Sequence, residues 1–303
     1  MTWLVTGATG LLGSNAAVQL SQEHQVVGAA RLIPMSAPVG FEAVDLSSAA
    51  SRRSLLERTS ATAVLHAAAI SSIEECERDP VLAREVNVIA SADLARQAAA
   101  AGAAFVYIST DAVFDGERGG YTEDDKPAPT TEYGRSKLAG ERAVLEANPN
   151  ALVARVNFYG WSPNGHRSLA EFFYSKLSSG EKVPGFTDVV VSTLYVGYLV
   201  ELIGQLIERQ ASGVVNVVSS ESTSKHEFGR RLARSFSFDQ DLVLSALSTE
   251  HLSIARGSRL DLSTERMNAL LDGPVPDQQM SMDRLLSDRA AGRVQAVASF
   301  RTR

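Results

Sequence analysis

Short apolar runs alternate with longer, helix-like stretches over residues 2–110. The runs are rich in Val, Ala and aromatic side chains, which is typical of strands buried on both faces of a parallel sheet. The clearest stretch between them, Pro80 to Ala101, is rich in Ala and Leu and stops at Gly102, as a helix does. Alternating strands and helices indicate βαβ units. The predicted strands are WLVTG, QVVGAA, FEAVDL, AVLHAAA and AFVYIST.

The pattern becomes less regular in the second half of the chain. ALVARV and VVNVVS predict two further strands, and Leu169 to Ser178 and Leu194 to Arg209 predict helices. The predicted fold class is α/β, a Rossmann-type doubly wound parallel sheet with a smaller C-terminal α/β substrate lobe. We expect the sheet domain to take residues 1–160 plus about 188–220, and the lobe to take 161–187 plus 221–303.

The stretch from Phe114 to Glu132 is rich in Gly, Pro and acidic residues and predicts a long loop. Long loops in compact domains are usually functional. Its acidic run from Glu123 to Asp125 is either solvated or part of a lid over a binding site.

Composition narrows the classes of protein to consider. The chain has 303 residues, 45% hydrophobic and 21% charged, which suits one two-lobed globule. The net charge is −6 without a basic cluster, so we expect no nucleic-acid partner. There is no apolar stretch of membrane-spanning length, and strand-like sequence begins at Thr2, so we expect no membrane contact and a cytoplasmic protein. Cys76 is the single cysteine and lacks metal-ligand spacing, so we expect no disulfide and no metal site.

The first predicted strand ends in TGATGLLG, with Gly7, Gly10 and Gly13 spaced three apart. Glycines between a strand and a helix let the backbone approach a pyrophosphate, and they aim the helix N-terminus at that anion. The alternative is a tight turn with close helix packing. The first interpretation predicts a cofactor-binding loop formed by Gly7, Thr9, Gly10, Leu11 and Leu12.

The second predicted strand lacks the acidic residue that binds the ribose hydroxyls of NAD. It offers Arg31 instead, and a guanidinium suits a 2′-phosphate, so we expect NADP(H) rather than NAD(H). The alternative for Arg31 is a solvated loop residue. We expect Asp45 and Leu46 to flank the adenine. The small side chains of Ala67, Ala68 and Ala69 should let the backbone approach the cofactor.

Tyr133 and Lys137 are four residues apart on a predicted helix, so their side chains project from one face. A nearby ammonium stabilises a phenolate and should lower the pKa of the tyrosine. Thr110, at the end of the fifth strand, offers a hydroxyl for a substrate oxygen. The three residues therefore predict a catalytic group that transfers a proton at a carbonyl, whereas the alternative is chance surface decoration.

These motifs identify a family resemblance. The chain resembles an extended short-chain dehydrogenase/reductase, with TGATGLLG for TGxxGxxG and YGRSK for YxxxK. More narrowly, STDAVFDG, YTEDDKPAP and YGRSKLAGE resemble the dTDP-4-dehydrorhamnose reductase branch, from about Gly7 to Arg155. The resemblance implies that Tyr133 is the proton donor and that Lys137 binds the nicotinamide ribose. It places Thr110 and Asp111 beside the reacting sugar carbon.

Further substrate-binding candidates lie at the predicted carboxyl edge of the sheet. Asn157 and Phe158 follow a strand there, where open α/β sheets bind ligands, although capping and packing are equally good explanations. Arg167 and Arg256 have a side chain that suits a diphosphate, but each also fits a surface cation. The substrate residues we expect are Ser71, Asp111, Asn157 and Phe158.

The chain departs from the branch at several positions. Ala112 replaces the Tyr after STD, and Thr131 replaces the Asn two residues before Tyr133. In the late segment RGSRLDLSTE, Gly257 and Glu265 stand where Pro and Lys are usual. Loss of an aromatic ring beside the sugar should open the pocket, so a substrate other than dTDP-4-dehydrorhamnose stays open.

The sequence thus predicts an NADPH-dependent oxidoreductase that reduces a keto group on a nucleotide-linked deoxysugar of the dTDP-4-keto-6-deoxyhexose type. Two alternatives stay open. One is an epimerase or dehydratase that retains NAD, against which Arg31 argues. The other is a non-catalytic regulatory subunit, because the methionine adenosyltransferase regulatory subunit shares this motif pattern. A homodimer is expected by analogy with the fold family.

Overall fold

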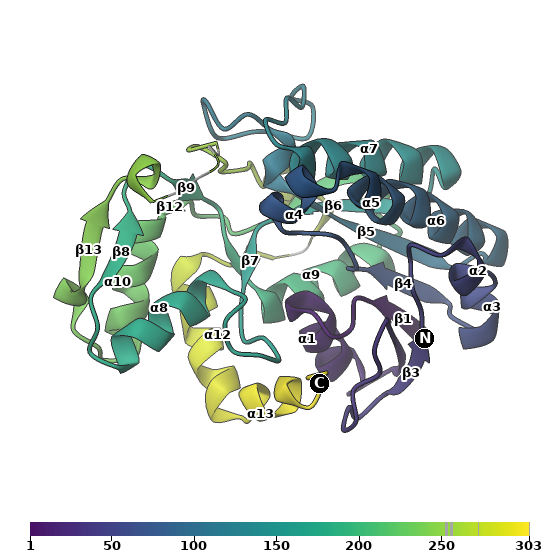
Figure 1. Cartoon of the computed structure of the whole chain (residues 1–303), viewed down its shortest axis with the longest axis horizontal. Coiled ribbons are helices and arrows are strands. Elements are labelled where there is room, and N and C mark those ends of the chain that lie inside the picture. The colour runs from purple at the N-terminus through teal and green to yellow at the C-terminus, as the bar shows by residue number, and fades with distance from the viewer. Residues whose placement is uncertain (252–253, 255–256, 272, 303) are drawn as a thin grey trace.

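The computed structural model describes residues 1–251, 254, 257–271 and 273–302. At its centre is a seven-stranded sheet in the order β11-β6-β5-β4-β1-β2-β3, in which every neighbouring pair is parallel (Figure 1). The strand order reverses between β1 and β4, the point where open α/β sheets bind ligands. The strands are β1 (Thr2–Thr6), β2 (Gln25–Ala30), β3 (Gly40–Ala43), β4 (Ala63–His66), β5 (Ala104–Thr110), β6 (Leu152–Val156) and β11 (Gly213–Val217).

Helices cover both faces of the sheet, as the continuous apolar strands require. Alternate side chains of β1 point to opposite faces: Trp3 and Val5 pack in the core beneath α1 (Leu11–Leu20) and α9 (Val196–Glu208). Leu4 packs in the other core, beneath α6 (Ala90–Ala101) and α7 (Glu132–Ala147). Figure 1 shows these two helix layers on either side of the strands. The predicted doubly wound Rossmann-type sheet is confirmed.

The predicted helix Pro80 to Ala101 is present but contains one wide turn. It consists of α5 (Pro80–Arg84), the π-helical turn η1 (Glu85–Ile89) and α6, and it ends at Gly102 with a left-handed φ of +64°. A π turn inside an α-helix often marks a functional site. The remaining short elements before β6 are α2 (Ala49–Arg52), α3 (Leu55–Thr59), α4 (Ile73–Arg78) and the 3-10 turn η2 (Asp111–Val113).

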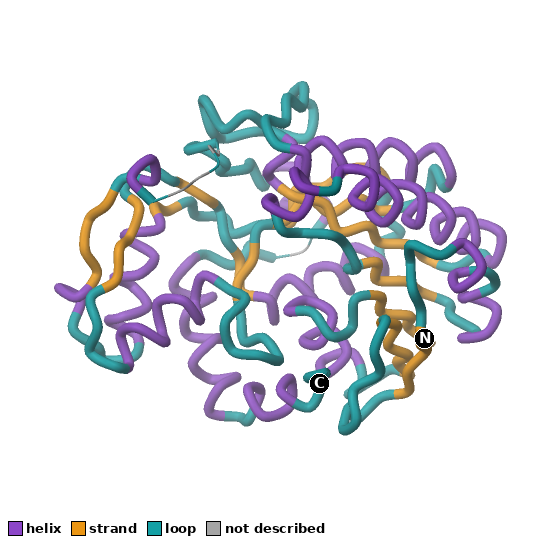
Figure 2. Tube along the Cα trace, viewed as in Figure 1, coloured by secondary structure: helices purple, strands orange, loops and turns teal. Residues whose placement is uncertain are grey.

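A smaller lobe, on the left in Figure 2, lies beside the carboxyl ends of the strands. Its parallel pair β8 (Val183–Phe186) and β13 (Val243–Ala246) packs with α8 (Leu169–Ser178) and α10 (Lys225–Ser235). Phe173 and Phe228 fill the space between these helices. The lobe and its connections also contain β7 (Phe158–Tyr159), β9 (Val190–Val191), β10 (Leu194–Tyr195), β12 (Thr223–Ser224), η3 (Gln240–Leu242) and η4 (Ser248–Glu250).

The long loop after η2 is attached to a late segment of the chain. The backbone N–H of Tyr121 donates to the carbonyl of Asp261 at 3.1 Å, and Ser263 N–H donates back to Tyr121 at 2.8 Å. The Asp261 carboxylate accepts from the N–H of Gly120 at 2.9 Å. The Tyr121 ring also stacks on Phe114, with ring centroids 4.2 Å apart. The loop is therefore an ordered bridge rather than a free lid.

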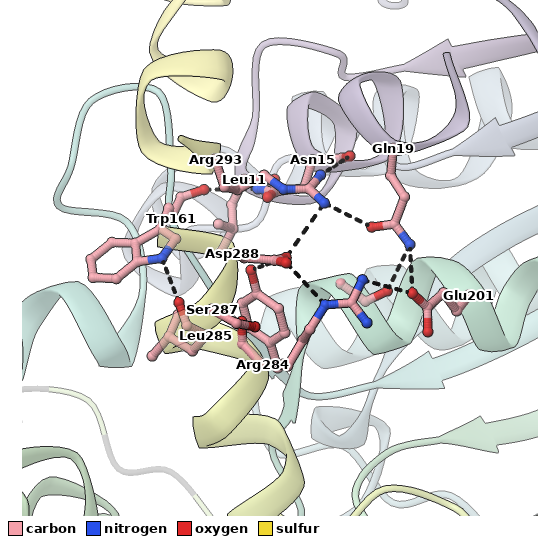
Figure 3. Close-up of polar contacts among 12 residues, drawn as sticks. Leu11, Asn15, Gln19, Trp161, Glu201, Arg284, Leu285, Ser287, Asp288 and Arg293 are labelled. Carbon is pink, nitrogen blue, oxygen red and sulfur yellow. Dashed lines mark hydrogen bonds and ion pairs between the residues drawn. The ribbon is translucent and has the colours of Figure 1, made fainter. Parts of the chain in front are cut away.

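The last helices return to the first helix of the sheet domain (Figure 3). Asp288 accepts hydrogen bonds from Arg284 Nε at 2.9 Å and from the Tyr195 hydroxyl at 2.8 Å. Arg293 approaches the same carboxylate at 3.4 Å and also reaches Gln19 of α1. These helices are α12 (Gln278–Ala290) and α13 (Arg293–Ala298); α11 (Glu265–Leu270) precedes them and packs against β11. No helix in the described part of the chain combines the length and apolarity needed to cross a bilayer.

Candidate active site

The glycine loop after β1 is built for close backbone approach. Gly7 has a φ of +66°, and a Cβ there would lie 2.8 Å from the backbone nitrogen of Ala68. A Cβ on Gly13 would lie 2.2 Å from the carbonyl oxygen of Gly7. Real Cβ atoms do not approach so closely, so neither position tolerates a side chain without a backbone shift. Close packing, the alternative explanation for the glycines, therefore applies to Gly13. It is compatible with the predicted role of the loop in binding a cofactor.

The N-terminus of α1 is free to bind an anion. Its N-cap is Gly10, which provides no side-chain cap, and its first turn carries no acidic residue. The first N–H groups of such a helix lack internal partners and carry partial positive charge. Thr9, Gly10 and Leu11 are half-buried around this terminus, whereas Leu12 is buried. The residues present therefore fit a pyrophosphate.

The predicted adenine end of the site lies where β2 and β3 finish. Arg31 is exposed immediately after β2. The hydroxyl and the amide of Ser47 lower the pKa of Asp45, and the charge of Arg31 lowers it further. Arg31 and Asp45 are thus close enough to interact. Leu46 is buried in the core, so its side chain packs inward.

The three alanines after β4 lie half-buried beside the glycine loop. Ala68 N–H donates to the Thr6 hydroxyl at 3.2 Å, and that hydroxyl lies 2.7 Å from Nδ1 of His66. Burial, and then the charge of Lys137, lower the pKa of His66 to about 3. His66 is therefore a neutral packing residue that fixes the backbone where Ala67, Ala68 and Ala69 begin.

Asn87, in the π turn, is a site residue that the sequence pattern did not single out. Its side-chain oxygen accepts from Ile70 N–H at 2.9 Å, and its amide donates to Ile70 O at 3.0 Å and to Ser136 Oγ at 2.9 Å. It is fully buried and joins the loop after β4 to α7. The sequence signals this role only by placing a polar Asn among the apolar residues of EVNVI.

Thr110, Tyr133 and Lys137 come together at the carboxyl edge of the sheet. Thr110 lies close enough to the Tyr133 hydroxyl for its side chain to influence the pKa of that group. Burial raises the pKa of Tyr133 to about 12, and the influence of Thr110 only partly opposes this. The expected lowering of this pKa by Lys137 is therefore wrong for the chain by itself, because burial of the phenolate has the largest influence on the pKa and raises it.

Lys137 lies one helical turn further along the buried face of α7. Its side chain is 2% exposed, and its ammonium lies 3.9 Å from the centre of the Tyr107 ring. Burial lowers its pKa to about 7, while Glu141 acts to raise it. Glu141 is held by Arg155 at 2.8 Å in a buried ion pair, so its charge has a fixed position behind Lys137.

Asp111 and Asn157 form the next layer of the site. Asp111 Oδ1 accepts from the Thr110 hydroxyl at 3.0 Å, and Oδ2 accepts from the amide of Asn157. Burial raises the pKa of Asp111 despite these hydrogen bonds and the more distant charge of Lys225. Phe158 continues the chain as part of β7 and is half-buried, and Ser71 is exposed between the alanines and α4.

Two departures from the related sequences lie at or beside the start of α7. Thr131 is the N-cap of α7, and its hydroxyl accepts from Gly134 N–H at 3.2 Å. This is a role that Asn also fills. Ala112 lies in η2, where its carbonyl would be 2.2 Å from a Cβ on Gly134. Glycine at position 134 therefore lets η2 and α7 meet.

The two arginines considered for a diphosphate remain untested. Arg167 is exposed, and its backbone N–H donates to Glu171 at 2.8 Å. Arg256 lies outside the described residues.

Two grooves border other parts of the molecule. One, of about 590 Å³, lies between α1, α9 and α12, and the second lies between η1 and α7.

Comparisons with known proteins agree with this geometry. A probable low-salt glycan biosynthesis reductase of Haloferax volcanii is 34% identical over 251 residues, covering 81% of this chain and 84% of that protein. Methionine adenosyltransferase 2 subunit beta of Rattus norvegicus is 38% identical over 183 residues, covering 59% of this chain and 53% of that protein. A dTDP-4-dehydrorhamnose reductase of Bacillus anthracis, solved in complex with NADP, superposes with a TM-score of 0.85 at 24% identity, covering 95% of this chain and 99% of that one.

The sequence pattern of the RmlD substrate binding domain matches residues 1–290, nearly the whole chain. The match spans the glycine loop, the Thr110–Tyr133–Lys137 group and the smaller lobe. The predicted resemblance is confirmed, and the chain belongs to the RmlD substrate binding domain family.

Proposed function

We propose that this chain is an NADPH-dependent oxidoreductase that reduces a keto group on a nucleotide-linked deoxysugar. The observation that carries the proposal is that Thr110, at the end of β5, lies close to Tyr133 of α7, which carries Lys137 one turn further. These residues lie at the same carboxyl edge of the sheet as the uncapped N-terminus of α1. The Haloferax volcanii relative, described as a reductase, covers most of the chain and supports the reaction class.

The cofactor assignment rests on the glycine loop after β1 and on Arg31 after β2. Gly7 and Gly10 keep the loop open to a pyrophosphate, and Arg31 offers an exposed guanidinium to a 2′-phosphate. NADPH supplies a hydride when it is bound. Lys137, on the inner face of α7, is the residue we assign to the nicotinamide ribose, as in the family pattern.

The proton comes from Tyr133. With a pKa of about 12 its hydroxyl is protonated at neutral pH, so it is ready to act as an acid. Hydride addition turns the substrate carbonyl into an alkoxide, which takes this proton while the Thr110 hydroxyl stabilises its developing charge. The ammonium of Lys137 then stabilises the phenolate that remains.

The substrate we propose is of the dTDP-4-keto-6-deoxyhexose type. Asp111, Asn157 and Phe158 lie beside Thr110, at the edge of the sheet that faces the smaller lobe. Ala112 offers a methyl group where related chains have an aromatic ring, which leaves room for a larger or differently oriented sugar. Ser71, exposed after the alanine run, borders the same edge.

Replacing Tyr133 with Phe tests the assignment. NADPH oxidation with a panel of 4-keto nucleotide sugars should fall by about 10²- to 10⁴-fold, because the general acid is removed. Tyr198→Phe, which deletes a hydroxyl from α9, serves as the control and should keep the wild-type rate. An unchanged rate in Tyr133→Phe would exclude this tyrosine as the proton donor.

One observation favours a second candidate function. The similarity to subunit beta of methionine adenosyltransferase 2 covers 59% of this chain. A regulatory subunit would bind a catalytic partner without turning over a sugar. A stable complex isolated by pull-down, together with no turnover on any keto sugar, would favour this candidate. Turnover that depends on Tyr133 favours the reductase.

A further inference from the structure

The ammonium of Lys137 lies over the face of an aromatic ring. Its Nζ atom is 3.9 Å from the centre of the Tyr107 ring. Both side chains are buried, so water is excluded from the contact. A cation within about 6 Å of a ring centre is attracted by the negative face of the ring, and more strongly where water is absent. Because Tyr107 belongs to β5 and Lys137 to α7, the contact joins the sheet to the helix that carries Tyr133.

The Tyr107 ring is itself held by its neighbours. Its hydroxyl donates to the carbonyl oxygen of Asn87, in the π turn, at 3.0 Å. The His66 ring stacks on it, with ring centroids 5.9 Å apart and planes inclined by 29°. Gly140 of α7 makes room for the hydroxyl, because a Cβ there would lie 2.2 Å from the Tyr107 oxygen. The ring therefore has little freedom to turn, and its face offers the ammonium a fixed position.

The carboxylate one turn further along α7 is engaged elsewhere. Glu141 Oε1 accepts from Arg155 Nε at 3.0 Å and from the Ser109 hydroxyl, and Oε2 accepts from Arg155 Nη2 at 2.8 Å. These hydrogen bonds direct Glu141 toward the strands of the sheet. A ring face attracts the positive charge as a whole, so the N–H groups of Lys137 that point away from it stay free to donate.

We propose that Tyr107 is a positioning residue for Lys137, whose ammonium its ring face holds ready for the hydroxyl groups of the nicotinamide ribose. A lysine side chain is flexible, and ordering it before the cofactor arrives removes part of the entropic cost of binding. The inference rests on the proposed reductase function and deepens it, because it concerns the residue assigned to the ribose. No bond is made or broken at Tyr107.

Proton NMR of the wild-type, cofactor-free chain tests the contact directly. The ring current of an aromatic side chain moves the signals of protons above its face upfield. The ε-methylene signal of Lys137 should therefore lie upfield of the signals of the exposed Lys126, Lys176 and Lys182. Lys137→Met assigns the signal by its loss. A Lys137 signal among those of the exposed lysines would overturn the inference.

Tyr107→Leu and Tyr107→Phe separate the ring face from the hydroxyl. Both lose the hydrogen bond to Asn87, but only the Leu variant loses the face. We expect Tyr107→Leu to bind NADPH about 2- to 30-fold more weakly than Tyr107→Phe, as the loss of a cation–π contact predicts. Phe105→Leu removes a ring from the same core two residues earlier on β5 and should keep the wild-type affinity. Calorimetric titration measures each Kd, and equal values for the two Tyr107 variants would contradict the proposal.

The charge state of Lys137 is a further readout. Its pKa is about 7, lowered mainly by burial and raised by Glu141 of α7 and Cys76 of α4, while His66 at the end of β4 is neutral. A ring face favours the cation, so removing the face should lower this pKa further. NMR titration of ¹³C-labelled lysines should give a value about 0.4 to 1.5 lower in Tyr107→Leu than in Tyr107→Phe. The same value in both variants would count against a cation–π contact.

These measurements need no turnover, so they separate the inference from the proposed function. If NADPH binds but no keto sugar is reduced, the reductase proposal fails, while the lysine signals and the NADPH affinities still decide whether Tyr107 positions Lys137. If Tyr107→Leu does not fold, the upfield shift of Lys137 in the wild-type chain decides by itself.

Discussion

Arg31 stands where a dinucleotide-binding strand usually ends in an acidic residue that binds ribose hydroxyls. Its guanidinium is exposed, and the nearby Asp45 carboxylate is held mainly by Ser47. Arg31 therefore remains available to a phosphate group. The selectivity between the two nicotinamide dinucleotides should depend on this one side chain.

Arg31→Ala should weaken binding of NADPH by about 1.5–3 kcal/mol, roughly tenfold to a hundredfold in Kd, because a charge-assisted contact is lost. Binding of NADH should change little, since it lacks the 2′-phosphate. Isothermal titration calorimetry with each dinucleotide measures both. Arg53→Ala, at an exposed position between α2 and α3, is the control. Equal weakening of both dinucleotides would mean that Arg31 does not recognise the phosphate.

The π turn between α5 and α6 brings the side chain of Asn87 to the loop after β4. A regular α-helix would place that residue differently around the axis, because a π turn shifts the register by one residue. Asn87 also reaches Ser136 on α7 at 2.9 Å. One side chain thus connects three elements of the proposed cofactor site.

Asn87→Ala should destabilise the fold by about 1–3 kcal/mol, because it leaves the polar backbone groups of Ile70 without their partner. It should also weaken NADPH binding, since the alanine run is no longer fixed. Urea unfolding and calorimetric titration report the two effects separately. Ser136→Ala removes one of the three hydrogen bonds and should show a smaller loss of stability. Wild-type affinity in a destabilised Asn87→Ala would limit this residue to a structural role.

The two lobes are tied together at two places remote from each other in sequence. The loop after η2 is attached to residues 257–263, and the terminal helices are attached to α1 through Asp288 and Arg293 (Figure 3). Arg284 and Arg293 both form ion pairs with the Asp288 carboxylate. Arg284 has a second carboxylate partner, Glu201, at 2.9 Å. Arg293 is 9% exposed, so its charge depends strongly on Asp288.

Asp288→Ala should lower the free energy of unfolding by about 3 kcal/mol, because it leaves the buried Arg293 without an anionic partner. Glu201→Gln changes a more exposed carboxylate of the same network and should cost less than about 1 kcal/mol. Urea denaturation gives both values, and hydrogen exchange should show faster opening of α13 in Asp288→Ala. Equal effects of the two variants would contradict the structural importance of Asp288.

Local sequence patterns determined the parallel sheet, its two helix layers, the glycine loop and the pairing of Tyr133 with Lys137. Strand alternation and the spacing of four residues on a helix depend only on neighbours in the chain, so they can be predicted without a fold. The roles predicted for Ser71, Asn157 and Phe158 stay predictions, since the sequence carries only their position after strands.

The tertiary structure decided what depends on distant partners. Three contacts join residues that no local pattern relates: Asn87 with Ile70, Asn157 with Asp111, and Tyr121 with Asp261. Protonation follows the same rule: Tyr133 and Lys137 have shifted pKa values because the fold removes water from them, and desolvation is a property of the whole packed chain.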